Sequence, residues 1–68
     1  MKSGILAESE GYDILINAEV RTFRDVWEYA YDAARNLKNQ ARHRNDVIEI
    51  RHRSNGQKQI VLEDGRLA

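Results

Sequence analysis

The 68-residue chain contains no cysteine and no proline. Without cysteine it can form neither a disulfide nor a thiolate metal site, two devices that often stabilise small domains. The absence of cysteine is also common among proteins of a reducing compartment. Folding must therefore rely on apolar packing, and self-association is one common further source of stability for a chain this short.

Long hydrophobic runs are also missing. Near the start, only Ile5-Leu6-Ala7 is apolar before Glu8 interrupts the run. A signal peptide needs roughly 7–15 apolar residues, and a membrane helix needs about 20. We therefore expect neither kind of segment, and cytoplasmic residence is the default expectation.

The net charge is zero, because eleven acidic side chains balance eleven basic ones. This balance argues against a protein that binds nucleic acid by bulk charge. The charges are unevenly distributed, however. Residues 1–33 carry seven acids and three bases, whereas residues 34–68 carry four acids and eight bases. The second half of the chain is therefore the place to look for a basic surface.

An amphipathic helix is the clearest predicted element. Thr22 and Asp25 resemble a capping box, the pattern that marks the start of many helices. The apolar residues that follow recur with the spacing of one helix face. They are Phe23, Val26, Trp27, Ala30, Ala33, Ala34, Leu37 and Ala41. The spacing predicts a helix over residues 23–43.

Two hairpins are predicted around this helix. Residues 12–20 alternate between apolar and polar side chains, as a half-buried strand does, and residues 5–7 would pair with them. After the helix, residues 47–53 and 58–63 form two apolar-rich segments. The Asn55-Gly56 step between these segments is a strong hairpin signal.

The register of the second hairpin follows from which residues must share a face. A three-residue loop over residues 54–56 places Ile50 opposite Ile60 and Ile48 opposite Leu62, so both apolar pairs lie on one face. A two-residue loop would instead place Ile60 opposite Arg51. We therefore predict the three-residue loop, with Gly56 in a left-handed conformation.

These elements predict one α+β domain over residues 1–68 in the order β-β-α-β-β, with the helix packed on one face of a mainly antiparallel sheet. Residues 1–3 and 65–68 are the expected positions of fraying. The predicted core consists of Ile14, Ile16, Phe23, Val26, Trp27, Ala30, Ala34, Leu37, Ile48, Ile50, Ile60 and Leu62.

The sheet face away from the helix is the first candidate for function. With the register above, Leu15 and Val61 point away from the helix and share that face with Arg51 and Arg53. An apolar centre with a charged rim is typical of an association surface. We therefore predict a protein partner or a homodimer at these four residues. The alternative interpretation is that these are scattered apolar residues on a solvent-exposed sheet face with no binding role.

Nucleic-acid binding is the second hypothesis. Basic side chains lie on one flank of the predicted helix and on the strand after it, and basic groups near aromatic rings can follow a phosphate backbone. The residues concerned are Arg35, Lys38, Arg42, Arg51 and Arg53. Ordinary placement of bases towards the end of a helix explains part of the same pattern.

The sequence contains no recognisable catalytic or metal-binding motif. His43 and His52 have no second ligand at metal-binding spacing, and the four glycines stand alone rather than in a phosphate-binding loop. A chain this short also has little volume for a ligand pocket. We therefore predict no enzymatic activity, no metal, no cofactor and no small-molecule substrate.

The pattern YDILIN, TFRDVWEYAYDAARNLKNQA, DVIEIRHRSNGQ and LEDGRL, which covers residues 12–66, resembles small uncharacterised bacterial and phage domains. This resemblance implies a strand, an alanine-spaced helix and a hairpin, and it assigns no functional residue. In size and composition the chain is also similar to small phage-encoded regulators and inhibitors, including anti-CRISPR proteins, which occlude a host protein. The expected function is a small non-enzymatic protein-binding module.

Overall fold

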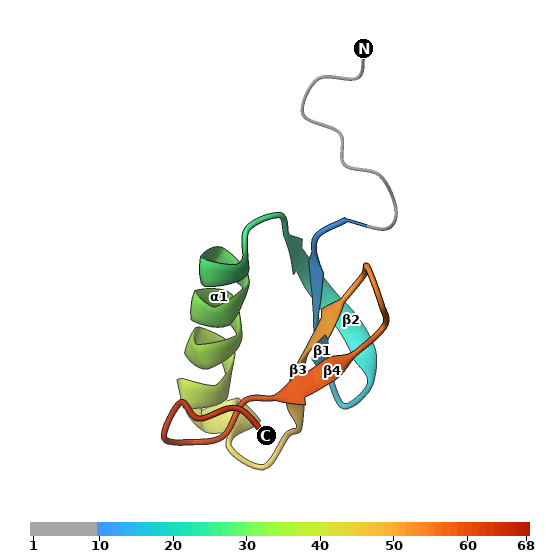
Figure 1. Cartoon of the computed structure of the whole chain (residues 1–68). Coiled ribbons are helices and arrows are strands. Elements are labelled where there is room, and N and C mark those ends of the chain that lie inside the picture. The colour runs from blue at the N-terminus through green and yellow to red at the C-terminus, as the bar shows by residue number, and fades with distance from the viewer. Residues whose placement is uncertain (1–9) are drawn as a thin grey trace.

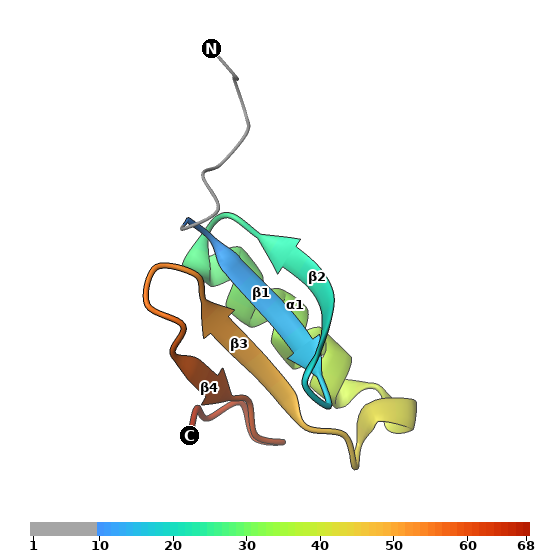
Figure 2. The ribbon, with the colours of Figure 1, turned by 90° about the vertical axis from the view of Figure 1, so that its right-hand side faces the viewer.

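The computed structural model describes residues 10–68, which form a four-stranded antiparallel sheet with one helix packed on one face (Figure 1). The elements are β1 (Tyr12–Ile16), β2 (Glu19–Arg24), α1 (Trp27–Asn39), a short 3-10 helix η1 (Ala41–His43), β3 (Ile48–His52) and β4 (Lys58–Ile60). Figure 2 shows the strand order β2-β1-β3-β4 with α1 behind the sheet. The predicted α+β class and the β-β-α-β-β order are confirmed.

The first hairpin differs from the predicted one. The strand expected over residues 12–20 is interrupted by a two-residue turn at Asn17 and Ala18, whose φ values are 51° and 74°. Asn17 also holds the turn against the strand β3, because its Oδ1 accepts a hydrogen bond of 2.9 Å from the backbone N–H of Val47. The partner of β1 is therefore β2. The predicted pairing with residues 5–7 lies outside the described residues.

The helix is shorter than the predicted span of residues 23–43. Thr22 lies in β2 opposite Ile14 and is not the N-cap. That position belongs to Val26, which has an extended backbone and no side-chain capping bond. Pairing with β1 thus outweighs the local capping signal, because it satisfies backbone groups of Thr22 and Arg24. At the other end, Gln40 is extended and stops the helix.

The second hairpin is shifted by one residue from the predicted register. Ile50 lies opposite Gln59, and Glu49 lies opposite Ile60. The loop is also longer than expected, since His52 donates its N–H to the carbonyl of Gln57 at 2.8 Å. A one-residue shift moves every side chain of a strand to the other face. Ile60 is therefore turned away from the helix.

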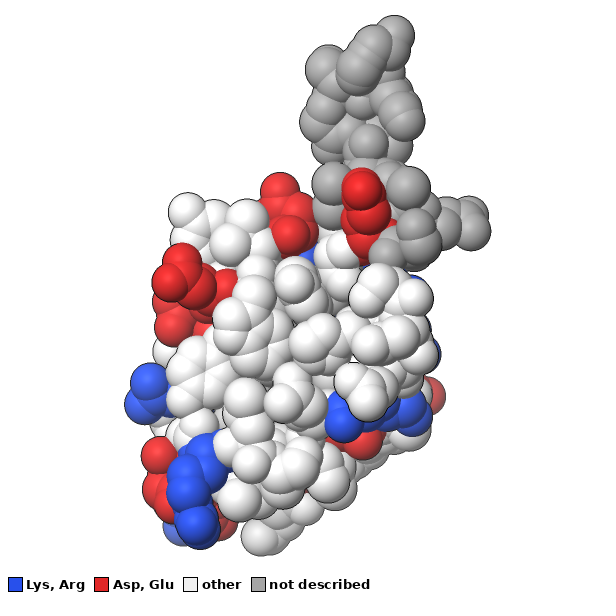
Figure 3. All heavy atoms as spheres, viewed as in Figure 1, with Lys and Arg blue, Asp and Glu red and all other residues white. Residues whose placement is uncertain are grey.

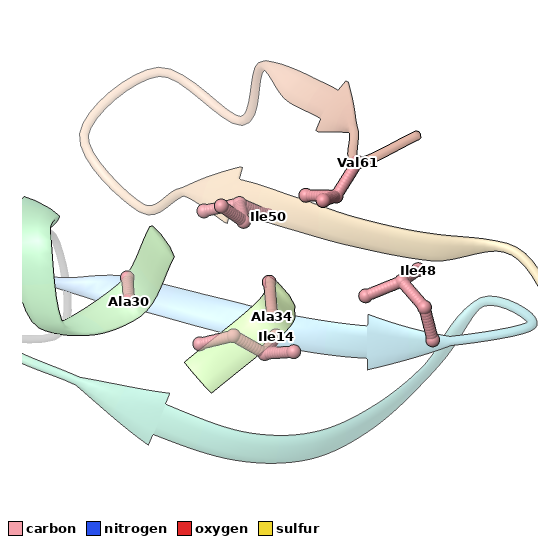
Figure 4. Packing of buried hydrophobic residues seen from close by; sticks show 6 residues of the cluster. All are labelled: Ile14, Ala30, Ala34, Ile48, Ile50 and Val61. Atoms are coloured by element: carbon pink, nitrogen blue, oxygen red, sulfur yellow. The ribbon is translucent and has the colours of Figure 1, made fainter. Parts of the chain in front are cut away.

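The core lies between α1 and the two central strands. It is formed by Ile14, Ala30, Ala34, Ile48, Ile50 and Val61 (Figure 4). Two alanines on the helix let its backbone approach the isoleucines of the sheet closely. The predicted core positions Val26 and Ile60 are wrong, because these residues are 41% and 37% exposed.

The chain after β4 folds back along the outer edge of that strand. Ala68 exchanges two backbone hydrogen bonds with Ile60, of 2.8 and 3.0 Å, and Leu67 forms a bridge with Val61. The hydroxyl of Tyr31 donates a bond of 2.5 Å to the carbonyl of Gly65. Residues 65–68, where fraying was expected, therefore cover an edge of the sheet and part of the core. Within residues 10–68 no helix is long and apolar enough to cross a membrane.

Candidate binding surface on the open sheet face

The sheet has one covered face and one open face. Ile14, Ile48 and Ile50 point towards α1, so the residues that alternate with them point to the other side. We call this other side the open face. Two rows of facing residues cross it in the order β2, β1, β3, β4. The first row is Phe23, Asp13, Arg51 and Lys58, and the second row is Val20, Leu15, Glu49 and Ile60. Figure 2 views the sheet from this side.

A buried carboxylate organises the first row. Asp13 is 3% exposed and lies on β1, which pairs with β2 on one side and with β3 on the other. Its Oδ2 accepts a hydrogen bond of 2.8 Å from Nη2 of Arg51. Its Oδ1 accepts bonds of 3.0 and 2.9 Å from Nε and Nη2 of Arg53. One carboxylate thus holds two guanidinium groups in defined positions.

The pKa of Asp13 reflects two opposing effects. Burial raises the pKa, because the charged form loses its hydration. The hydrogen bonds and positive charges of Arg53 and Arg51 outweigh that effect and hold the pKa below its ordinary value. Asp13 is therefore a carboxylate at neutral pH, and the cluster of Asp13, Arg51 and Arg53 carries one net positive charge.

Phe23 supports the cluster from β2. The guanidinium carbon of Arg53 lies 4.3 Å from the centre of the Phe23 ring, a cation–π contact. The ring also fills the space beside Gly11, where an added Cβ would come within 2.3 Å of the ring. Arg53 is therefore restrained from two sides, by the carboxylate and by the aromatic ring.

A shallow depression of about 490 Å³ opens beside these groups. It is lined by Asp13, Arg51, Arg53 and Gly56. Each arginine side chain is about one third exposed, at 35% for Arg51 and 31% for Arg53. Guanidinium groups recognise carboxylates by paired hydrogen bonds. The depression therefore offers fixed, partly exposed donors to an acidic group of a partner.

The four predicted contact residues fall into two pairs. Arg51 and Arg53 lie on the open face, as predicted. The placement of Leu15 and Val61 as exposed contacts is wrong, because each is only 1% exposed. The one-residue shift in register turns Val61 towards α1, where it joins the core. Leu15 does lie on the open face, but it is buried there.

Other apolar residues take the exposed positions on this side of the sheet. Val20 is 55% exposed and Ile60 is 37% exposed, and both belong to the same row as Leu15. Sequence reasoning missed these two residues because it placed the turn and the register differently. It missed Asp13 because the pairing of β1 with β3 was unknown.

The five residues of the nucleic-acid hypothesis do not share one surface. Arg51 and Arg53 lie on the open face, whereas the other three lie on α1 and η1, on the opposite side. Two of those three are engaged in local bonds. Lys38 donates to the carbonyls of Arg44 and Asp46, at 3.0 and 2.8 Å. Arg42 donates to Gln40 at 3.1 Å. In the view of Figure 3, uncharged residues form most of the surface between helix and sheet.

The two histidines take structural positions. Nδ1 of His43 lies 2.8 Å from Oδ2 of Asp46, and Oδ1 of Asp46 accepts a bond of 3.0 Å from Nδ2 of Asn17; these contacts lower the pKa of Asp46. His52 packs against the rings of Tyr12 and Trp27, at centroid distances of 5.2 and 5.3 Å. In the part of the chain that the structure describes, no three His, Cys, Asp or Glu side chains form a group able to hold a metal ion.

Comparison of the chain with protein-family models, with curated proteins and with solved structures finds no match. The resemblance to small bacterial and phage domains therefore stays a prediction.

Proposed function

We propose that this chain is a small non-enzymatic protein-binding module that contacts its partner through the open face of the sheet. The contact residues are Arg51 and Arg53, with Val20 and Ile60 as apolar neighbours. The partner surface would carry an acidic side chain that enters the depression beside Asp13. An inhibitor that works by occluding a host protein would use the face in the same way.

The observation that carries this proposal is the buried carboxylate of Asp13, which fixes two arginines on an open surface. An arginine loses about 2 kcal/mol of rotamer entropy when it is fully immobilised. Here the bonds to Asp13 already restrict the arginine side chains in the folded protein, so binding would cost less rotamer entropy. Arginine is also enriched among the residues that dominate binding energy at protein interfaces.

Apolar side chains complete the interface. Val20 and Ile60 lie on two different strands, on either side of the covered Leu15 and of Glu49. Exposed apolar groups surrounded by charged ones are typical of the core and rim of an association surface. Binding would remove these side chains from water, at about 25 cal/mol for each Å² of apolar surface buried.

Affinity capture from the lysate of the native host tests the proposal with a matched pair of variants. Ile60→Asp adds an acid to the open face, whereas Tyr29→Asp adds the same acid to α1, at a side chain that is 60% exposed. We expect a captured protein to be lost with Ile60→Asp and kept with Tyr29→Asp. Equal capture by both variants would contradict the proposal, provided that circular dichroism shows both to be folded.

Nuclease treatment of the same samples separates the alternative function. Nucleic-acid binding through Arg35, Lys38, Arg42, Arg51 and Arg53 would make the capture disappear with nuclease. It would also give an affinity that falls with salt, with a log–log slope of about −0.9 for each duplex phosphate neutralised. A protein captured equally well with and without nuclease would support the protein-binding proposal.

A further inference from the structure

The strand β2 forms an edge of the sheet. The opposite edge, at β4, is covered by residues 67 and 68 of the same chain. Within residues 10–68 no strand lies on the outer side of β2. An edge strand of six residues presents backbone groups that can pair with another chain. We infer that two copies of this chain associate by pairing β2 with β2 in antiparallel fashion around a twofold axis.

The hydrogen-bonding pattern identifies the backbone groups that face outward. Asn17 donates to Val47 at the end of the β1–β3 ladder. Because an antiparallel ladder alternates, odd-numbered residues of β1 bond to β3 and even-numbered ones bond to β2. The residues of β2 opposite those odd-numbered residues are Val20 and Phe23. Their N–H and C=O groups therefore point away from β1, towards the open edge.

A second copy fits this edge in one symmetric register that uses all six residues. Val20 then lies opposite Phe23 of the second copy, and the outward backbone groups of these two residues meet. The Phe23 carbonyl, which accepts a bond of 2.7 Å from Nη1 of Arg24 in its own chain, would be shared with or released to the second copy. Glu19 lies opposite Arg24 of the second copy, so each copy contributes one acid and one base to two ion pairs. Opposite charges and apolar pairs in facing positions are the cross-strand pairs that stabilise a sheet.

The two faces of the sheet also match in this register. Val20 and Phe23 are opposite Leu15 and Asp13, so both lie on the open face. Glu19 and Arg24 are opposite Ile16 and Tyr12, so both lie on the helix side. Each facing pair therefore belongs to one side of the sheet. Val20, at 55% exposed the most exposed apolar residue on β2, would lie next to residue 23 of the second copy.

The β-bulge between Ile14 and Leu15 is compatible with this arrangement. It adds one residue to β2 between Val20 and Phe23 and so places the two outward residues three positions apart. A bulge often protects an edge against pairing with an unrelated strand. In a regular strand the outward residues are two positions apart, so such a strand does not match the three-position spacing of β2. A second copy has the same three-position spacing, and a twofold axis between Arg21 and Thr22 brings the two bulges together.

Sedimentation velocity over a range of concentrations tests the inference with charge reversals on the full chain. Glu19→Arg places two bases opposite each other, and we expect the dimer dissociation constant to rise about tenfold. The double variant Glu19→Arg/Arg24→Glu restores opposite charges and should return to within about threefold of the wild type. A wild type that stays monomeric at millimolar concentration, or a double variant no tighter than Glu19→Arg, would overturn the inference.

Disulfide trapping tests the register directly, since the chain has no native cysteine. Residues 20 and 23 of one chain lie about 10 Å apart along the strand, beyond the roughly 7 Å Cα separation that a disulfide spans. Oxidised Val20→Cys/Phe23→Cys should therefore yield a covalent dimer. The matched control Val20→Cys/Thr22→Cys places its second thiol on the helix side and should yield much less dimer. Equal yields from the two variants would refute this register.

Val20 belongs to both proposed interfaces, but Ile60 distinguishes this association from binding through the open face. Ile60 lies on β4, at the opposite end of the strand order from β2. Ile60→Asp should therefore leave the dimer dissociation constant unchanged. A dimer that is lost with Ile60→Asp and unaffected by Glu19→Arg would place self-association on the open face and overturn the inference.

Discussion

Replacement of Asp13 by Asn tests whether the buried carboxylate supports the fold as well as the open face. The amide has nearly the same shape but no charge, so Arg51 and Arg53 would face each other without a counter-charge. Asp13 accepts three hydrogen bonds from charged donors, all between 2.8 and 3.0 Å. In the variant one of the two oxygens becomes an NH2 group, which cannot accept from its arginine, and the bonds that remain lose the negative charge of the acceptor.

The magnitude follows from the burial of the partners. Removing one member of a fully buried ion pair costs about 3–5 kcal/mol. The two arginine side chains are 35% and 31% exposed, so water can solvate them once the carboxylate is gone. We therefore expect Asp13→Asn to lower the free energy of unfolding by about 2–3 kcal/mol. A chain of this length has a total of about 3–10 kcal/mol, so the variant would lose a large fraction of its stability.

Urea unfolding followed by circular dichroism measures this effect. With a slope of about 1 kcal/mol per molar urea, the midpoint should fall by about 2–3 M. Asp64→Asn removes an exposed ion pair with Arg66 and serves as the matched control, with a much smaller expected shift. A shift below about 0.5 M for Asp13→Asn would refute the reasoning, because it would mean that the buried ion pair contributes almost nothing.

The pH dependence gives an independent test of the same ion pair. The folded pKa of Asp13 lies below the ordinary value of 3.8. Its stabilising contribution is therefore present above about pH 4 and is lost as the pH falls through the depressed folded pKa. The difference in unfolding free energy between wild type and Asp13→Asn should shrink below that pH. Asp46 and Asp64 also have lowered pKa values, but both proteins contain them and their contributions cancel.

Turn and packing positions yield two further predictions, each measured by urea unfolding. Gly11→Ala should destabilise the protein by about 2 kcal/mol or more, because φ is 95° and the new Cβ would lie 2.3 Å from the Phe23 ring. Gly56→Ala, with φ at 76° and open space around it, should cost only about 1 kcal/mol; equal costs would contradict the proposed clash. Ala18→Gly should stabilise the protein by about 0.5–1 kcal/mol, because φ at Ala18 is 74°; a loss of stability would show that the turn is not strained.

Local patterns predicted the class of the fold but not the ends of its elements. The alternation of residues 12–20 predicts one strand, because Ala18 and Val20 continue the apolar series of Tyr12, Ile14 and Ile16 in the sequence. The turn nevertheless places Val20 on the opposite face, beside Leu15. Asn17 was the one signal for the turn, but Ala18 stands where glycine is usual. Thr22 had a good capping partner in Asp25, yet it joined β2 because pairing with β1 satisfies more backbone groups.

The candidate site could not be predicted in full, because it depends on the order of the strands in the sheet. The apolar periodicity of a sequence does not give that order. Arg51 and Arg53 were placed on the open face correctly, since they alternate with Ile50 on the same strand. Their carboxylate partner Asp13 lies 38 and 40 residues away in sequence. Only the pairing of β1 with β3 brings the three together, and a single sequence holds no signal for that pairing when both hairpins are compatible with several sheets.

The register of the second hairpin leads to the last prediction. The sequence pattern favoured Ile60 inside and Val61 outside, because two isoleucines then paired on one face. In the structure the loop is one residue longer, Val61 is 1% exposed, and Ile60 is 37% exposed. Leu67, which pairs with Val61 and packs against the core, favours this arrangement because it adds a second apolar residue to the inner side.

The two registers predict opposite outcomes for one pair of variants. Val61→Asp places an unpaired carboxylate in the core and should cost more than about 4 kcal/mol, enough to unfold much of the population. Ile60→Asp lies on the open face at a partly exposed position and should lower the free energy of unfolding by only about 1–2 kcal/mol. The reverse order in urea unfolding would mean that the predicted register is the right one. Because Ile60→Asp should remain folded, its loss of a captured partner can be assigned to the surface rather than to the fold.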